Sequence, residues 1–510
     1  MKTVMKKILN LGLTCVLLLV VSSCDKGFDD LNTNRVDPIA IDQVFLLNNA
    51  IINTTFPGGT LVYEIGIVQQ IISPNSGVLT GANYNQDNRN STNNLWVSYY
   101  RNVIKHTRDL LNQIKDKPER ANLASMARLI QAYAFLVLTD TYGDIPYSEG
   151  GKGYTDQVVF PKYDAQQDIY PALIQEIAQA TAALSNSART EPGEVLYGGN
   201  IDRWRRLGYS LMLRAGMRLS RANAGLAQQT VQAAFQGGVM QSNDDNYVVR
   251  HDNNFTNGIG NTLNATEANN YYLVSSFVDY LKNNDDPRLG AIAVRYVGAT
   301  SGPQQTPALA SVDPAVQIGM PMGHDNNTIV GVASGLGLAS FYDFSQADRR
   351  RVVKRNAPMF MVTHAQTQLL LAEAASRGWI SGDVATFYNA GVRAHMEQMA
   401  LYDPGSAIEA SAIDAYLAAK PYDAANALNQ INTQYWVASF LNGPEAWANF
   451  RRSGFPALTK NPFPSQDISG DFIRRLTYPS SEIAVNGENI NAAIARQGPD
   501  NLDTRVWWDK

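Results

Sequence analysis

The sequence predicts a mostly α-helical body with long loops and little β structure. Three segments have the helical periodicity that places apolar residues on one face, namely residues 123–137, 203–215 and 361–375. In the second segment, Arg203, Arg206 and Arg214 are expected on the side opposite the apolar stripe. Strand-like alternation is scarce, and residues 247–250 are one short candidate for a strand.

The apolar stripes carry small residues, which allow neighbouring helices to approach closely. These positions are Ala127, Ala134, Gly208, Ala215 and Ala372. Close approach of this kind is typical of stacked helix pairs of the tetratricopeptide type. We therefore expect tetratricopeptide-like helix pairs, although the full repeat signature is absent from the sequence.

The amino terminus has the order of a secretory signal peptide. Lysines precede an apolar run over residues 8–21, and small residues then lead directly to Cys24. This arrangement resembles the lipobox of bacterial lipoproteins, in which the cysteine after the cleavage point accepts fatty acids such as palmitate. An ordinary signal peptide with an incidental cysteine is the alternative. We expect residues 1–23 to be the lipoprotein signal peptide and Cys24 to be lipidated.

The rest of the chain divides into a tether and a body. Residues 24–40 are polar and rich in turn formers, as a spacer behind a lipid would be, and residues 41–510 are expected to form a single binding domain. Of the 2 cysteines, Cys15 leaves with the signal peptide and Cys24 carries the lipid. No thiol then remains for disulfides, metal binding or nucleophilic attack. A net charge of −4 argues against a nucleic-acid partner.

Sequence motifs for catalysis are missing. No metalloprotease, serine hydrolase or phosphate-loop pattern occurs, and the 5 histidines are scattered singly, whereas zinc sites bring clustered ligands. We expect no catalytic residue, no metal and no cofactor, and hence no enzyme. A pair of acids that cleaves a glycosidic bond leaves no motif, so a surface glycoside hydrolase stays as an alternative.

Three loops are the expected places for a binding site, namely residues 81–94, 251–270 and 299–340. An Asn amide offers a donor and an acceptor that match neighbouring sugar hydroxyls, and an aromatic ring can stack on the apolar face of a pyranose. The same amides pair equally well with peptide groups. Trp96 shares a helical face with Tyr100 and is expected in the core. The candidate ligand-binding residues are Tyr84, Asn85, Asn88, Arg89, Asn254, Phe255, Tyr271, Tyr272 and Asn326.

Five segments together resemble the SusD/RagB family of outer-membrane, nutrient-binding lipoproteins. Tyr142, Trp447, Phe450 and Tyr478 within them are expected to be packing and turn residues rather than ligand contacts. Their order after the lipobox, and their spread over nearly the whole chain, make the resemblance specific. The segments are DTYGDIPY at 140–147, QTQLLLAEAA at 366–375, PEAWANFRRSGFP at 444–456, RRLTYPSSE at 474–482 with Asn486, and DTRVWWD at 503–509.

The resemblance implies a SusD-like helical body whose long loops form a ligand-binding face. It also implies a lipid-anchored protein of the Gram-negative outer membrane, exposed at the cell surface. Such a protein captures oligosaccharides or glycans and delivers them to a SusC-like TonB-dependent β-barrel transporter. The same role with oligopeptides is an alternative, because members of one fold serve different ligands.

Overall fold

The computed structural model describes residues 1, 4, 41–77 and 79–510. Cys24, the tether and nearly all of the signal peptide lie outside the described residues, so those predictions stay predictions. Residues 1–43 and 44–510 form two separate units, and the second is the folded body described below.

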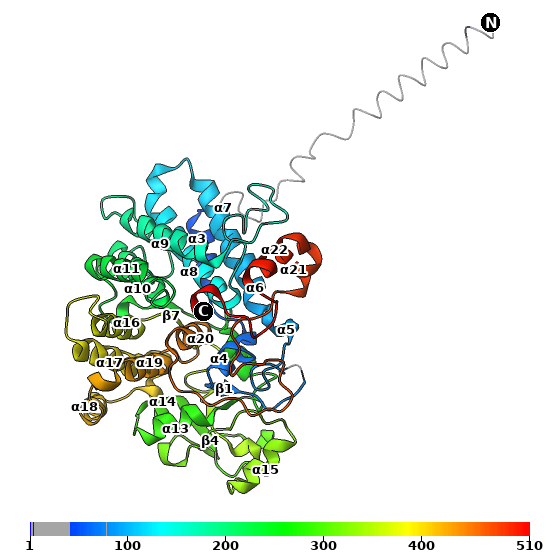
Figure 1. The fold of residues 1–510 in the computed structure, drawn as a ribbon, viewed down its shortest axis with the longest axis vertical. Coiled ribbons are helices and arrows are strands. Elements are labelled where there is room, and N and C mark those ends of the chain that lie inside the picture. Colours follow the sequence, from blue (N-terminus) through cyan, green and yellow to red (C-terminus); the bar gives the residue numbers. More distant parts are fainter. Residues whose placement is uncertain (2–3, 5–40, 78) are drawn as a thin grey trace. The chain divides into compact units, whose positions relative to one another are not determined.

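Helices dominate the body, which confirms the predicted fold class (Figure 1). The short 3-10 or π segments are Gly58–Leu61, Tyr100–Ile104, Pro118–Arg120, Asn243–Asp245, Gly302–Gln304, Pro314–Val316, Phe341–Asp343, Pro404–Ser406, Ala424–Asn426 and Trp507–Asp509. The α-helices are α3 (Val44–Ile52), α4 (Glu64–Ile67), α5 (Arg89–Thr92), α6 (Asn94–Tyr99), α7 (Lys105–Ile114), α8 (Ala121–Tyr142), α9 (Gln166–Ala182), α10 (Ile201–Arg218), α11 (Ala224–Gly237), α12 (Gly258–Leu263), α13 (Ser275–Asn283), α14 (Arg288–Ile292), α15 (Thr328–Gly335), α16 (His364–Ser376), α17 (Val384–Tyr402), α18 (Ala410–Ala419), α19 (Ala427–Ala438), α20 (Gly443–Ser453), α21 (Ser480–Val485) and α22 (Gly487–Gln497).

Long helices pack in successive pairs, α8 with α9, α10 with α11 and α16 with α17, and α10 joins the first pair to the third (Figure 1). A small residue is needed at one of these contacts. A Cβ atom on Gly208 of α10 would come within 2.0 Å of the Thr181 hydroxyl of α9. The predicted close approach at Gly208 is therefore confirmed.

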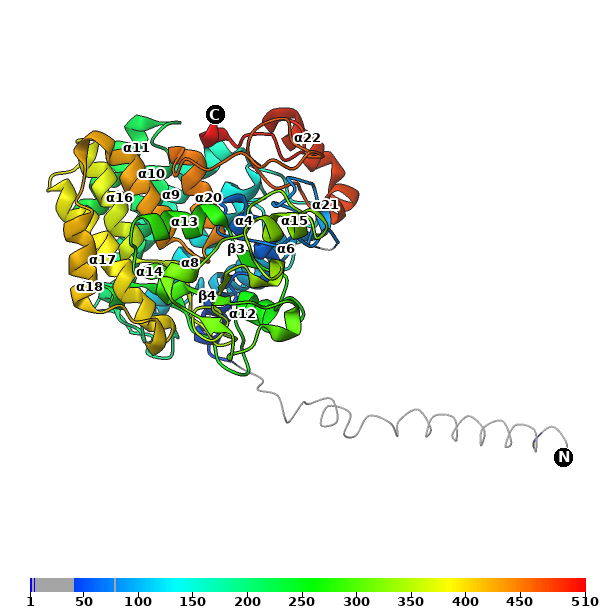
Figure 2. The ribbon, with the colours of Figure 1, turned by 90° about the horizontal axis from the view of Figure 1, so that it is seen from below.

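The view in Figure 2 separates the helix pairs from the loops. Helices α10, α11, α16, α17 and α18 gather at one end of this view, and α15, α21 and α22 lie towards the other. The end with few long helices is therefore where irregular backbone reaches the surface.

Helix α8 is the central helix of the body. Together with the turn before it, it spans Pro118–Tyr142, and by length and composition alone this helix could cross a membrane. However, 83% of its apolar window is buried inside the body, so it is a core helix. It ends at Gly143, whose φ of 81° lies in the left-handed region that favours glycine.

The strands of the described residues form two antiparallel pairs and one three-stranded antiparallel sheet, and two isolated bridges lie outside them. The predicted strand at residues 247–250 is confirmed as β2, which pairs with β7. Strand β3 pairs with β1, and β4 lies between β5 and β6. The strands are β1 (Ile71–Ile72), β2 (Tyr247–Val249), β3 (Tyr272–Leu273), β4 (Ala293–Tyr296), β5 (Ala310–Ser311), β6 (Gln346–Ala347) and β7 (Met359–Val362).

The third helical stripe begins later than predicted. Met361 lies in β7, and α16 starts at His364 behind a capping box formed by Thr363 and Gln366. The prediction failed there because the apolar residues of a buried strand continued the helical spacing by chance. The body of the stripe, including Leu369 and Ala372, is helical and buried as expected.

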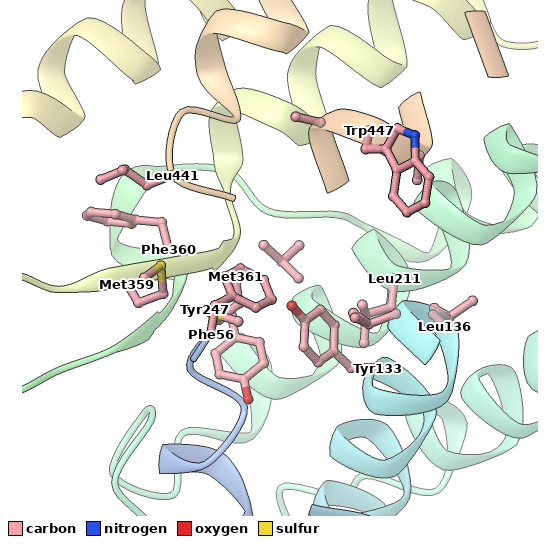
Figure 3. Packing of buried hydrophobic residues seen from close by; sticks show 14 of the residues in the cluster. Phe56, Tyr133, Leu136, Leu211, Tyr247, Met359, Phe360, Met361, Leu441 and Trp447 are labelled. Carbon is pink, nitrogen blue, oxygen red and sulfur yellow. The ribbon is translucent and has the colours of Figure 1, made fainter. Parts of the chain in front are cut away.

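A main hydrophobic core runs through the helix pairs. Figure 3 shows Tyr133 and Leu136 of α8 close to Leu211 of α10, with Phe56, Tyr247 and residues of β7 beside them. A smaller second core lies beneath α15 and holds Ile72, Tyr272, Ile329 and Phe344. This second core supports the loops that were expected to bind ligand.

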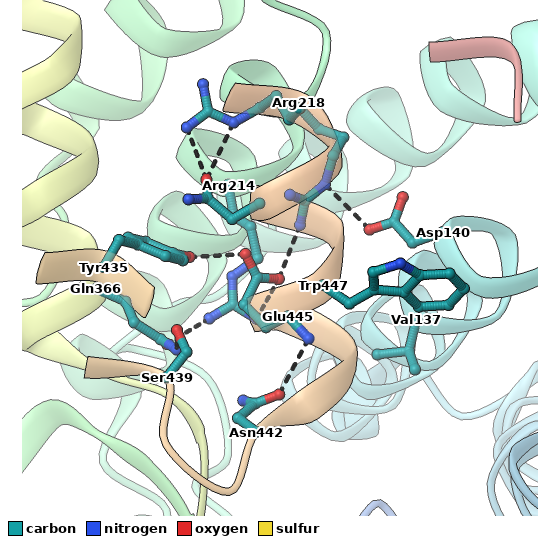
Figure 4. A network of polar contacts seen from close by, with 12 residues as sticks. Val137, Asp140, Arg214, Arg218, Gln366, Tyr435, Ser439, Asn442, Glu445 and Trp447 are labelled. Carbon is teal, nitrogen blue, oxygen red and sulfur yellow. Dashed lines mark hydrogen bonds and ion pairs between the residues drawn. The ribbon is translucent and has the colours of Figure 1, made fainter. Parts of the chain in front are cut away.

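Arg214 is buried in the core, so the prediction that it faces the opposite, polar side of α10 was wrong. It lies 3.4 Å from the carboxylate of Glu445, which also accepts hydrogen bonds from Arg218 and from the hydroxyl of Tyr435 (Figure 4). Burial opposes the ionisation of Glu445, but Arg214 and Arg218 outweigh it and lower the pKa of its carboxyl. The buried arginine is stable there because α20 supplies its counter-charge.

The aromatic residues in the family-like segments pack the interior. Tyr142, Trp447, Phe450 and Tyr478 are all buried, which confirms the structural role expected for them. The Trp447 indole donates to the carbonyl of Ile473, and the Tyr478 hydroxyl donates to that of Asp144. These segments therefore hold distant parts of the chain together.

Candidate ligand-binding face

The Asn side chains of the first predicted loop are used to join segments of the body. Asn83 donates to the carbonyl of His324 at 3.0 Å and accepts from the backbone of Gly323 at 2.9 Å. Asn85 donates to the Gln466 side-chain oxygen at 2.8 Å. The first loop is thus tied to the third loop and to the segment around residue 466.

Tyr84 does not offer its ring to solvent. The side chain is buried, its hydroxyl donates to the carbonyl of Pro74 at 2.5 Å, and its ring lies 4.7 Å from that of Phe463. Burial raises the pKa of the Tyr84 hydroxyl. Tyr84 is therefore a packing residue in this conformation, and Phe463 is the half-exposed ring beside it.

Tyr84→Ala is accordingly expected to lower the free energy of unfolding by about 3 kcal/mol, because it leaves a cavity next to Phe463. Tyr84→Phe keeps the ring and is expected to cost about 1 kcal/mol for the lost hydrogen bond. Urea unfolding of both variants measures this. A change below about 0.5 kcal/mol for Tyr84→Ala is the size expected for a surface substitution. Such a small change would show that the ring does not pack the interior.

Asn88 and Arg89 connect the first loop to other segments. Asn88 donates its side-chain amide to the carbonyl of Thr80 at 2.8 Å. Arg89 forms ion pairs with Asp500 at 2.8 Å and with Asp87 at 3.1 Å. The guanidinium of Arg89 is therefore already engaged by one carboxylate of the first loop and one near the carboxyl terminus.

The second loop lies against different partners. The backbone N–H groups of Asn254 and Phe255 both donate to Asp252 at 2.7 Å, and they lower the pKa of that carboxyl. Phe255 stacks on His251 with ring centres 5.1 Å apart, and His251 contacts Thr55. The Asn254 side chain is exposed. This loop is joined to the segment that follows α3 rather than to the first loop.

Tyr271 and Tyr272 are buried beneath the surface. The Tyr272 hydroxyl donates to the carbonyl of Asn269 at 2.6 Å, and its ring belongs to the second core. Burial raises the pKa of both hydroxyls. These two tyrosines therefore support the surface and are not part of it in this conformation.

Asn326 is the candidate of the third loop and it is exposed. It sits in a turn in which Asp325 accepts hydrogen bonds from the backbone of Asn327 and Thr328, so the turn holds its shape without using Asn326. The Asn326 amide makes no hydrogen bond within residues 41–77 and 79–510. Its donor and acceptor are thus available to a ligand.

An aromatic pair that the sequence reasoning missed lies just beyond the third loop. Phe341 and Tyr342 stack with ring centres 4.2 Å apart and planes inclined by 29°, and both are half-exposed. Phe341 packs on the second core, where Tyr272 meets it edge-on. The adjacency of two aromatics after a Gly-rich stretch was the available indication in the sequence.

A buried amide lies beside this pair. Gln305 donates to the backbone carbonyl of Tyr342 at 2.9 Å, while its side-chain oxygen has no partner among the residues described. Nearby, the guanidinium of Arg349 lies 5.4 Å above the ring of Tyr296 and donates to its hydroxyl. Since buried polar groups are normally paired, Gln305 marks a place where an added donor would be stabilising.

We call residues 322–328, 340–342 and 461–467, with α15, the loop face. Helix α15 and the turn that carries Phe341 pack on one another through the second core. Gly323 fits closely against Pro462, since a Cβ atom on this glycine would lie 2.8 Å from the proline ring. The loop face therefore presents half-exposed rings and the free amide of Asn326 on a supported surface, which is the chemistry that binds sugar hydroxyls and apolar sugar faces.

Comparison with known proteins decides the family. A family model described as "Starch-binding associating with outer membrane" matches residues 34–479. The chain belongs to the SusD-like family. A solved chitin-binding protein is 30% identical, with a TM-score of 0.81, and the match covers 92% of this chain and 100% of that one. The predicted SusD/RagB membership is thereby confirmed.

Other SusD-like structures have the same fold. A SusD-like protein from Bacteroidetes AC2a is 25% identical with a TM-score of 0.80, and a SusD homologue from Bacteroides fragilis is 23% identical with a TM-score of 0.74. Both matches cover 92% of this SusD-like chain and 100% of the other chain. None of the curated proteins searched matches the sequence.

Metal binding was not expected, and the described residues contain no group of three or more His, Cys, Asp or Glu side chains placed to hold a metal ion. Three histidines of the SusD-like body have polar side-chain contacts, and His251 is one of them. His364, for example, contacts the carbonyl of Met240, and His395 contacts Arg288 in the interior.

Proposed function

We propose that this SusD-like protein binds oligosaccharides at its loop face and is not an enzyme. The observation that carries the proposal is the 30% identity, over the whole of the solved chain, with a chitin-binding protein. The family description as starch-binding supports the same class of ligand. The half-exposed Phe341–Tyr342 pair and the free amide of Asn326 supply the contacts that a sugar chain needs.

We propose further that the protein is anchored through a lipid on Cys24 at the cell surface and passes its ligand to a SusC-like TonB-dependent transporter. The lipobox and the family description, which places members at the outer membrane, support this arrangement. Membrane fractionation of Cys24→Ser tests the anchor. We expect release into the soluble fraction, and retention in the membrane would contradict the anchor.

Tyr342→Ala is expected to weaken the binding of oligosaccharide about fivefold, because one stacking ring is worth about 1 kcal/mol. Isothermal titration calorimetry with chitin oligosaccharides, starch oligosaccharides and mixed oligopeptides measures the change and also identifies the ligand class. The melting temperature is expected to change little, since the Tyr342 side chain is half-exposed.

Tyr154→Ala is the matched control, because Tyr154 is an exposed tyrosine outside the loop face. It is expected to bind oligosaccharide as the wild type does. An equal loss in both variants, or unchanged affinity in Tyr342→Ala, would place the ligand elsewhere. If only oligopeptides bind, the sugar proposal is wrong and the peptide alternative holds.

A further inference from the structure

Exposed apolar side chains gather on two neighbouring segments away from the loop face. Val159 and Phe160 precede α9, and Val485 is the last residue of α21; the exposed fractions are 70%, 58% and 65%. The side chains of Asn486 and Asn489 join the two segments, since they donate to the carbonyls of Pro161 and Phe160. Clustered exposed apolar side chains of this kind are typical of an interaction site.

The patch surrounds a pocket of about 230 Å³. The residues that line it include Trp96, Tyr100, Pro146, Val159 and Val485. Ligand pockets of drug-sized molecules measure about 300–1,000 Å³, so this pocket is suited to a single large side chain. Trp96 is almost wholly buried, so its face is not free to stack on a sugar ring.

One carboxylate faces this pocket. Glu482 of α21 lines it, accepts a hydrogen bond from the Tyr163 hydroxyl at 3.2 Å, and also interacts with the Trp96 side chain. Within residues 41–77 and 79–510, no Lys, Arg or His side chain forms an ion pair with Glu482. A carboxylate has acceptor capacity for more than one donor, so Glu482 can take a further hydrogen bond from a group that enters the pocket.

We infer that this patch and its pocket, which we call the α21 patch, are the docking site of the membrane transporter in the proposed function. A loop of the transporter inserts one Tyr or Trp side chain, whose ring lies against Pro146, Val159 and Val485 and whose O–H or N–H donates to Glu482. Such an anchored aromatic residue, inserted into a small pocket, is the kind of contact that contributes most to a protein interface. The inference rests on the proposed function.

A membrane-embedded protein fits this site better than a lipid surface does. Burying the Glu482 carboxylate in hydrocarbon is costly, whereas a protein side chain can pair with it. The body starts only seventeen residues after Cys24, and fully extended these span at most about 60 Å. The proposed anchor thus keeps the protein close to a partner in the same membrane and raises their effective concentration.

The two surfaces are separate. Figure 1 shows α21 well apart from α15 along the vertical axis of the body. A change at the α21 patch is therefore expected to leave the loop face intact, and both can be occupied at the same time.

Co-purification tests the docking site. The full lipoprotein is expressed in its own cells with an affinity tag, solubilised in mild detergent, and the TonB-dependent barrel bound to it is identified and quantified by mass spectrometry. Val485→Asp and Glu482→Gln are each expected to reduce the bound transporter at least tenfold. Affinity for oligosaccharide and the melting temperature are expected to stay at wild-type values.

Val195→Asp is the matched control, because Val195 is 50% exposed and lies outside the α21 patch. It is expected to retain the transporter. Full retention in the two patch variants, or an equal loss in Val195→Asp, would overturn the docking site while leaving the proposed function standing. Failure of the wild type to retain any transporter would overturn both the docking site and the proposed delivery to a transporter. A concentration-dependent dimer that Val485→Asp abolishes would assign the patch to a second copy instead.

Discussion

Glu373→Gln is expected to lower the free energy of unfolding at pH 7 by about 3 kcal/mol. The Glu373 carboxylate accepts two hydrogen bonds from Arg452, at 2.7 and 2.6 Å, and both side chains are buried. Burial alone would raise its pKa, but Arg452 and Arg377 outweigh burial and lower the pKa of Glu373 to about 2. An amide at this position would leave the buried Arg452 without its counter-charge.

The sign of the pH dependence follows from this lowered pKa. The native state holds the Glu373 proton less tightly than the unfolded chain does, so the stabilisation is present above about pH 4.5 and is lost as the pH falls towards 2. Urea unfolding of wild type and variant between pH 7 and pH 3 measures the difference, which is expected to shrink as the pH falls.

Asp414→Asn is the control for this experiment, because Asp414 pairs with Arg393 at an exposed site. Its effect is expected to stay below about 1 kcal/mol. A loss of the same small size for Glu373→Gln would mean that the buried pair does not hold α16 to α20. Glu373 and Arg452 lie in two of the family-like segments. This ion pair therefore gives both segments a structural role, which is to hold α16 to α20.

Glu64→Gln is expected to stabilise the protein above pH 8. Glu64 begins α4, is buried, and has no ion pair in the part of the chain that the structure describes. Burial raises the pKa of its carboxyl from an ordinary value near 4.5 to about 8. The native state therefore holds this proton more tightly than the unfolded chain, and wild-type stability falls as the pH rises from about 4.5 to 8.

The size of the effect is about 1.4 kcal/mol for each pH unit, or roughly 5 kcal/mol over the whole interval. Glu64→Gln stays neutral and lacks this loss, so its stability is expected to match the wild type near pH 4 and to exceed it at pH 9. Urea unfolding at pH 4, 6.5 and 9 measures both proteins. If the free energy of unfolding changed with pH in the same way for both proteins, a buried Glu64 carboxyl with a raised pKa would be contradicted.

Local periodicity was enough to predict most of three long helices, whereas the family-like segments came from the motif resemblance. Residues 123–137 and 366–375 lie within helices because apolar spacing and local capping determine them. Met361 was misplaced because it lies in a short buried strand whose apolar residues happen to continue the spacing of the following helix. Arg214 was misplaced because its partner, Glu445, is far away in the sequence and periodicity carries no information about it.

The binding residues were harder to predict for the same reason. Tyr84 looked exposed in a polar loop, but Phe463, 379 positions later, covers its ring. Tyr272 is buried by α15 and the turn at Phe341, which the sequence places in a region without a clear period. Asn326 was predicted to be free for a ligand, and its side chain is exposed, although its binding role stays a prediction.

Binding of the purified wild-type lipoprotein to polysaccharide, followed by the chain length of that polysaccharide, tests the central claim most directly. Affinity electrophoresis in gels containing soluble chitin derivatives or starch measures retardation, and chromatography of the recovered polymer measures cleavage. We predict retardation by at least one of these polymers with its chain length unchanged. Migration unaffected by every polymer, or shortening of a polymer that is bound, would contradict a non-catalytic glycan-binding protein.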